Sequence, residues 1–180
     1  KSLDDIKDFR QLHGKCAGHP EYGLVPGIEA TTGPLGQGVA TSVGMAIAER
    51  WMENYFNRHG HEIINHNIFA IAGDGCMMEG ISGEAASLAG HLGLGNLIWI
   101  YDNNHITIEG ETSLAFSEDV AARFKAYGWK VLHVGDANDL VKLEKVFQAA
   151  LSETDRPTLV VVDSHIAYGS PNKQRSEEHT

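Results

Sequence analysis

Two polar segments, each placed directly after an apolar run, contain the residues best suited to chemistry. Gly73-Asp74-Gly75 follows the run at residues 68–72, and Asp102-Asn103-Asn104 follows the run at residues 97–101. Continuous apolar runs are typical of parallel strands that are covered on both faces. Ligands of such sheets bind at the carboxyl ends of the strands. We therefore expect Asp74 and Asn104 to lie at the same rim and to face one crevice.

Asp74 and Asn104 carry hard oxygen atoms, which suit a magnesium ion bound to a diphosphate. Mg²⁺ prefers octahedral oxygen coordination and is usually held by one or two carboxylates together with phosphate oxygens. Gly75 has no Cβ, so the backbone there can approach a phosphate closely. A helix beginning near residue 82 could direct its positive end at the same anion. The simpler interpretations are that Asp74 caps the next turn and that Asn104 occupies a turn.

Four motifs follow one another along the chain: Gly18-His19-Pro20-Glu21, residues 31–38 (TTGPLGQG), residues 73–85 (GDGCMMEGISGEA) and residues 101–110 (YDNNHITIEG). Gly-Asp-Gly followed by Asn at this distance is the motif of thiamine-diphosphate enzymes. Together the four motifs resemble the transketolase family, and the resemblance extends over about residues 9–174. It implies thiamine diphosphate and Mg²⁺ as cofactors.

The resemblance assigns three metal ligands. Asp74 and the side-chain oxygen of Asn104 are implied as the first two, and the backbone carbonyl of Ile106 as the third. Asp102 and Asn103 are expected to support the turn and to contact the ligands.

The resemblance also assigns residues that contact the organic part of the cofactor. Gly33, Pro34 and Leu35 match the loop that lies against its aminopyrimidine end, and Ile166 matches a residue beside the thiazolium. Gly75 is expected at the diphosphate. The loop could also serve as the turn into the next helix, and Ile166 could be a core residue.

Two residues are expected to take part in catalysis. His19 matches a position that faces the substrate in the family, and a histidine can donate to a sugar hydroxyl or an oxyanion. Glu79 matches a residue at the dimer interface near the cofactor, where a buried acidic pair relays a proton. The simpler interpretations are a solvated loop histidine and a helix cap.

Composition excludes several other classes of protein. The chain has 180 residues, 42% of them hydrophobic, and a formal net charge of −10 with basic and acidic residues interspersed. A nucleic-acid-binding domain would need a basic stripe, which the sequence lacks. Two cysteines without a Cys-x-x-Cys pattern fit a reducing compartment. We found neither a signal peptide nor a membrane-length apolar run, so we expect a cytoplasmic protein.

Hydrophobic periodicity predicts alternating helices and strands. Such alternation is typical of βαβ units, so we expect an α/β fold with a parallel sheet and helices on both faces. Helices are predicted at 3–12, 36–57, 82–93, 118–127 and 138–152, strands at 68–72, 97–101, 129–134 and 158–162, and long loops at 14–38 and 102–117.

Residues 1–174 are expected to form one cofactor-binding domain that is truncated at both ends. Residues 175–180 depart from the family text and match the translation of a common sequencing adapter, so we expect a non-native tail. A genuine charged tail is the alternative.

The resemblance implies transfer of a two-carbon ketol unit between ketose and aldose phosphates, as in the pentose phosphate pathway and the Calvin cycle. The family acts as a homodimer on sugar phosphates, and its catalytic glutamate belongs to a second domain. We therefore expect the isolated chain to be inactive, with an exposed apolar patch at Leu35, Met77, Met78 and Ile81. The alternatives are a dihydroxyacetone-synthase-like sister enzyme and a non-catalytic subunit or scaffold domain of a split enzyme.

Overall fold

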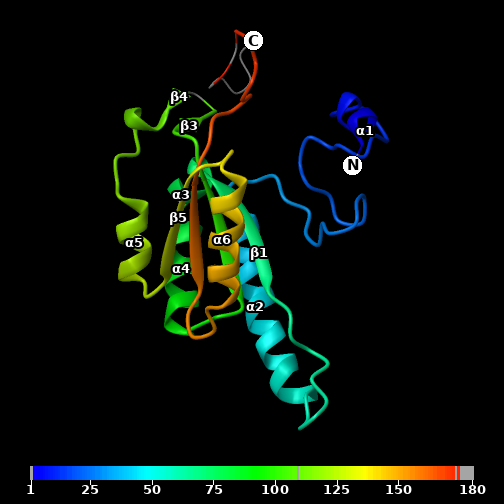
Figure 1. Ribbon diagram of the computed structural model, residues 1–180, viewed down its shortest axis with the longest axis vertical. Helices are drawn as coiled ribbons and strands as arrows, with labels where there is room; N and C mark the ends of the chain where they lie inside the picture. Colours follow the sequence, from blue (N-terminus) through cyan, green and yellow to red (C-terminus); the bar gives the residue numbers. More distant parts are fainter. Residues whose placement is uncertain (1, 109, 173, 175–180) are drawn as a thin grey trace.

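The computed structural model describes residues 2–108, 110–172 and 174, and its centre is a four-stranded parallel sheet (Figure 1). The order of the strands across the sheet is β1-β2-β6-β5. They are β1 (Ile68–Gly73), β2 (Leu97–Asn103), β6 (Thr158–Asp163) and β5 (Lys130–Asp136). All three pairings are parallel, which confirms the predicted α/β sheet. The predicted tail, residues 175–180, lies outside the described residues.

Helices cover both faces of this sheet, as the sequence predicts. One face carries α2 (Gln37–Phe56), α4 (Gly80–His91) and α5 (Val120–Ala126), whose apolar side chains share a core cluster with the strands. The other face carries α6 (Leu140–Leu151), which packs through Leu143, Val146 and Phe147. Figure 1 shows α6 in front of the strands and α4 behind them.

The central strand β2 is held from both faces. Trp99 and Tyr101 belong to the core cluster shared with α2, α4 and α5, whereas Ile98 belongs to the cluster shared with α6. Trp99 is fully buried, and its indole N–H donates to the Ser42 hydroxyl at 2.9 Å. A buried polar group without such a partner would cost about 1–3 kcal/mol. Packing on both faces therefore fixes the position of the carboxyl end of β2.

The register of the sheet brings the carboxyl ends of β1 and β2 together. Gly73 pairs with Asp102, and Asn103 pairs with Asp163 of β6. After β1 the chain enters the short helix α3 (Asp74–Met78). After β2 it forms a small hairpin of β3 (Ile106–Thr107) and β4 (Gly110–Glu111), followed by the 3₁₀ turn η1 (Thr112–Leu114).

The amino-terminal helix is shorter than the sequence predicts. The spacing of Ile6, Phe9 and Leu12 predicts a helix over residues 3–12, but α1 (Leu3–Lys7) ends after five residues. All three apolar side chains are more than half exposed in the described part of the chain. Most helices in proteins are stabilised by packing of an apolar face. This segment has little such packing, so the helix does not extend beyond Lys7.

Two other boundaries also differ from the prediction. The helix expected at residues 82–93 begins at Gly80, because the extended backbone of Glu79 (φ −72°, ψ 135°) separates it from α3, which was not predicted. The loop expected at residues 102–117 contains the β3–β4 hairpin and η1. The Thr107 hydroxyl donates to the carbonyl of Gly110 at 3.0 Å and stabilises this hairpin.

The edge strand β1 is covered less well than the centre of the sheet. Phe69 and Ile71 are 52% and 76% exposed on the face that α6 covers elsewhere.

Within the described residues, no helix combines the length and the apolar character needed to span a bilayer.

Candidate functional site

The carboxylate of Asp74 joins the ends of β1 and β2. Asp74 follows β1 directly and is 2% exposed. Its Oδ1 accepts a hydrogen bond from the Tyr101 hydroxyl at 2.5 Å. Its Oδ2 accepts the backbone N–H groups of Asn104 at 3.1 Å and His105 at 2.8 Å. These bonds run to the end of β2, so Asp74 organises that strand end as well as presenting a buried carboxylate at the rim.

Tyr101 keeps its proton in this environment. Burial, followed by the hydrogen bond to Asp74, raises the pKa of Tyr101 well above its ordinary value. A protonated phenol is a donor, and a carboxylate that receives a donor at this distance is held in one orientation. Sequence reasoning did not assign a role to Tyr101, because it reads as one more residue of a buried apolar strand.

The turn after β2 presents the amide of Asn104. Its Oδ1 accepts the backbone N–H of Ile106 at 3.0 Å, and its Nδ2 donates to Asp102 Oδ2 at 3.1 Å. His105 adopts a positive φ of 63°, and its carbonyl accepts the N–H of Thr112 at 3.0 Å. The predicted turn is therefore present, and the hydrogen bonds of Asp74 and Asp102 support it.

A cavity of about 460 Å³ lies at this rim and brings together most of the predicted cofactor residues. This volume falls within the range of roughly 300–1,000 Å³ that small-molecule sites occupy. Among the residues lining it are Leu35, Asp74, Gly75, Glu79, Asn104 and Ile106. The prediction that Asp74 and Asn104 lie at one rim is confirmed.

The oxygen groups beside this cavity fit a hard cation that carries a diphosphate. Asp74, Asn104 and Ile106 all line the cavity, and their chemistry includes a carboxylate, an amide oxygen and a backbone carbonyl, the kinds of ligand that Mg²⁺ favours. Gly75 and Leu35 both line the cavity and pack directly against each other, since a Cβ on Gly75 would lie 3.0 Å from Leu35 Cδ1. Among the described residues, no cluster of three or more histidine, cysteine or acidic side chains is placed to hold a metal, so the oxygen groups named here include an amide and a backbone carbonyl.

The loop at residues 33–36 connects this cavity to His19. A Cβ on Gly33 would lie 3.7 Å from the His19 ring, so the imidazole packs against this glycine. Gly36 has a φ of 81°, and a Cβ there would meet Ile81 at 2.8 Å and Glu79 at 2.9 Å. The loop is thus seated on the start of α4, with Leu35 beside Gly75 and Pro34 exposed.

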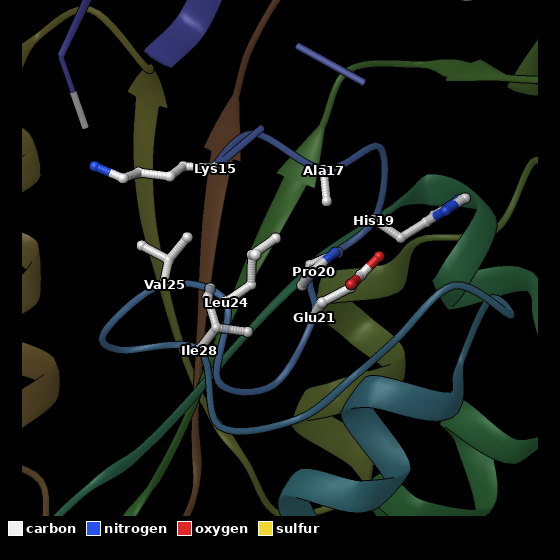
Figure 2. Close-up of a pocket in the computed structure, with 8 residues that line it drawn as sticks. All are labelled: Lys15, Ala17, His19, Pro20, Glu21, Leu24, Val25 and Ile28. Atoms are coloured by element: carbon white, nitrogen blue, oxygen red, sulfur yellow. The ribbon is translucent and has the colours of Figure 1, made fainter. Parts of the chain in front are cut away.

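His19 lines a second, smaller cavity of about 130 Å³ (Figure 2). Figure 2 shows Leu24, Val25 and Ile28 gathered together, with the His19 ring directed away from them. His19 is exposed. The structure therefore brings His19 to Gly33 but places it in a different cavity from Asp74.

Three other sequence predictions have mixed outcomes. Glu79 occupies the N-cap position of α4, lines the larger cavity and is exposed, and its side chain caps none of the N–H groups of that described helix. Ile166 is half-buried after β6 and is not among the described residues that line the larger cavity. The expected exposure of Met77 is wrong: this side chain is fully buried, because α3 turns it into the core.

The rest of the predicted apolar patch is exposed. Leu35, Met78 and Ile81 are between 40% and 45% exposed and lie near the mouth of the larger cavity or at the start of α4. Residues of similar exposure occur on most protein surfaces, but these three are grouped.

Comparison with known proteins agrees with this geometry. A family profile described as "Transketolase, thiamine diphosphate binding domain" matches residues 1–180. The chain belongs to the transketolase family. It is 57% identical over 172 residues to the transketolase of Geobacillus stearothermophilus and 54% identical over 176 residues to that of Nostoc sp.. These alignments cover 96% and 97% of the chain and 26% of each relative.

Solved transketolases share its fold. The enzyme from Leishmania mexicana superposes with a TM-score of 0.88 at 45% identity, covering 97% of this chain and 26% of that one. A transketolase from Pichia stipitis, solved in complex with sedoheptulose-7-phosphate, gives a TM-score of 0.88 at 46% identity with the same coverage. The chain therefore has the transketolase cofactor-binding fold and spans about a quarter of the length of these relatives.

Proposed function

We propose that this chain supplies the thiamine diphosphate and Mg²⁺ site of a transketolase. The reaction is transfer of a two-carbon ketol unit from a ketose phosphate to an aldose phosphate. The proposal depends mainly on one observation: Asp74, Gly75, Asn104 and Ile106 line the same cavity, which lies at the ends of two adjacent parallel strands. Membership of the transketolase family supports it.

Asp74, Asn104 and Ile106 would hold the cation. Both lone pairs of Asp74 Oδ2 are engaged by backbone N–H groups, whereas Oδ1 has one hydrogen bond from Tyr101 and one lone pair left. Asn104 Oδ1 likewise has one bond, from the N–H of Ile106, and one lone pair left. Each side chain can therefore give one oxygen to Mg²⁺ without breaking the hydrogen bonds that position it.

The same cavity would hold the diphosphate and its neighbouring ring. Gly75 gives the phosphates access to the backbone, and Gly33, Pro34 and Leu35 would lie against the aminopyrimidine. Ile166 would pack beside the thiazolium. When bound, thiamine diphosphate supplies the carbon nucleophile and the electron sink for ketol transfer, and the protein supplies position and acid–base groups.

His19 and Glu79 would act at the two sides of this cofactor. The His19 ring, held against Gly33 and exposed, would bind the sugar phosphate by donating to a hydroxyl or an oxyanion. Glu79 lines the cavity and is exposed in this chain, so it would meet a partner subunit and relay a proton across a homodimer. The Pichia stipitis relative in complex with sedoheptulose-7-phosphate supports sugar phosphates as substrates.

An activity assay on the complete natural polypeptide that carries this sequence tests the proposal. Xylulose 5-phosphate and ribose 5-phosphate should react only when both thiamine diphosphate and Mg²⁺ are present. Turnover without either cofactor would contradict the proposed chemistry. Cofactor binding without turnover of these sugars would favour a sister enzyme or a non-catalytic domain. The homodimer and the cytoplasmic location stay predictions.

A further inference from the structure

Asp102 carries a carboxylate beside the proposed metal site. The proposed function gives this residue no role. It is the last residue but one of β2, is half-buried and lines the larger cavity. Both of its oxygens accept hydrogen bonds from side chains. The Ser164 hydroxyl donates to Oδ1, and the Asn104 amide donates to Oδ2 at 3.1 Å.

The amide of Asn104 has two ends of similar size, and only the oxygen end can bind a cation. Asp102 presents an acceptor oxygen, so it favours the NH₂ end facing it. The N–H of Ile106 can only donate, and at 3.0 Å it favours the oxygen end facing it. The two neighbours therefore select the same orientation, in which the oxygen keeps one lone pair free.

Ser164 links the Asp102 carboxylate, and through it the orientation of the Asn104 amide, to the neighbouring strand of the sheet. It follows β6 directly, and its backbone N–H donates to the carbonyl of Asn103 at 3.3 Å. The pairing of Asn103 with Asp163 sets the relative position of the two strand ends. Ser164 can thus hold the Asp102 carboxylate in place from the neighbouring strand.

We propose that Asp102, held by Ser164, is a positioning residue that keeps the amide oxygen of Asn104 directed at the cation. This inference rests on the proposed metal site and adds the residues that orient one of its ligands. Groups that orient metal ligands typically change metal affinity by 10–100-fold when they are removed.

The first test measures Mg²⁺ binding by calorimetry, using the complete natural polypeptide in saturating thiamine diphosphate. Asp102→Asn should weaken Mg²⁺ binding by about tenfold or more, because an amide at position 102 accepts either end of Asn104. Asp163→Asn is the matched control: it removes one charge from the same rim, and Asp163 contacts Asn103 (2.8 Å), not the Asn104 amide. The control should lose less than about threefold, since a solvated charge is largely screened.

Ser164→Ala is a second variant, which keeps both carboxylates and serves if Asp102→Asn fails to fold. It should weaken Mg²⁺ binding less than Asp102→Asn but more than Asp163→Asn. Affinity equal to that of the wild type would overturn the proposed role of Ser164.

The decisive comparison repeats Asp102→Asn in an Asn104→Asp background. A carboxylate at position 104 presents an oxygen in either orientation. In this background Asp102→Asn should therefore cause no further loss of Mg²⁺ affinity. An equal loss in both backgrounds would show that Asp102 acts through its charge, as a direct ligand or on folding, and would overturn the positioning role. Wild-type protein that binds thiamine diphosphate without Mg²⁺ dependence would instead overturn the proposed metal site itself.

Discussion

Gly36→Ala is expected to disturb the seat of the cofactor loop. Gly36 has a φ of 81°, a conformation that costs a residue with a Cβ about 1–2 kcal/mol. The new methyl would also lie 2.8 Å from Ile81 Cγ2, 2.9 Å from Glu79 Cβ and 3.1 Å from Ser82 Oγ. Crowding of this kind typically costs a further 1–3 kcal/mol or so. The total is therefore about 2–5 kcal/mol.

Gly60→Ala provides a control with the same backbone strain and no crowding. Its φ is 79°, and a Cβ there would have no described atom within 4 Å apart from those of the adjacent residues. Gly60 lies beyond the carboxyl end of α2, whereas Gly36 caps the amino end of this 20-residue helix, about 30 Å away. The difference between the two variants therefore isolates the contact with the start of α4.

Gly36→Ala can relieve its crowding by moving residues 33–36 off α4, which would carry Leu35 away from Gly75. We expect thiamine diphosphate affinity to fall at least about tenfold, equivalent to 1.4 kcal/mol, with unchanged affinity for Gly60→Ala. Calorimetry on the complete polypeptide gives the affinities, and thermal unfolding gives the accompanying loss of stability. Equal behaviour of the two variants in both measurements would refute the proposed seating of the loop.

Three further predictions concern Tyr101 and the isolated chain. Above pH 10 the folded protein should hold one more proton than the unfolded chain, because the pKa of Tyr101 is raised on folding. Its contribution to stability is complete below pH 10 and is lost above it by up to about 1.4 kcal/mol per pH unit. Tyrosinate absorbance up to pH 11 should be the same for wild type and Tyr101→Phe; excess wild-type absorbance with a midpoint near 10 would refute the raised pKa. The isolated chain should show no ketol transfer in a coupled assay, and measurable turnover would mean that a second domain is dispensable. It should also self-associate in light scattering, less so after Met78→Ser with Ile81→Ser, whereas a dispersed wild-type monomer would favour a self-sufficient scaffold domain.

The proximity of Asp74 and Asn104 could be predicted because it follows from the direction of the parallel strands. Buried parallel strands are recognisable as continuous apolar runs, and their carboxyl ends share a rim. Asp74 and Asn104 each follow such a run, so their proximity needed no side-chain information. The cavity that contains both confirms this part of the prediction.

The hydrogen bonds that support the site could not be predicted in the same way. Tyr101 belongs to an apolar run, and only the structure shows its hydroxyl on Asp74. Ser164 lies 62 positions from Asp102 in sequence, and the sheet brings the two together. Contacts of this kind depend on the register of the strands, which a continuous apolar run does not specify because both of its faces are apolar.

Short elements were predicted least well. Residues 74–78 include Gly75, a poor helix former, but they form α3, which buries Met77 and leaves Met78 exposed. Periodicity over five residues cannot separate a helical turn from a loop, so the error in Met77 follows from the missed helix. At the amino terminus the apolar residues have helical spacing. Their side chains are exposed, so they provide little packing that would extend α1.

The central claim is that Asp74 binds the cation that carries thiamine diphosphate. The most direct test is calorimetric titration of thiamine diphosphate into the complete polypeptide, with Mg²⁺ and with a chelator, for the wild type and Asp74→Ala. A bound cation carries the largest charge in such a site, so losing its carboxylate leaves the diphosphate poorly neutralised. We predict that the variant with Mg²⁺ binds as weakly as the wild type with chelator. Unchanged, Mg²⁺-dependent affinity in Asp74→Ala would contradict the claim.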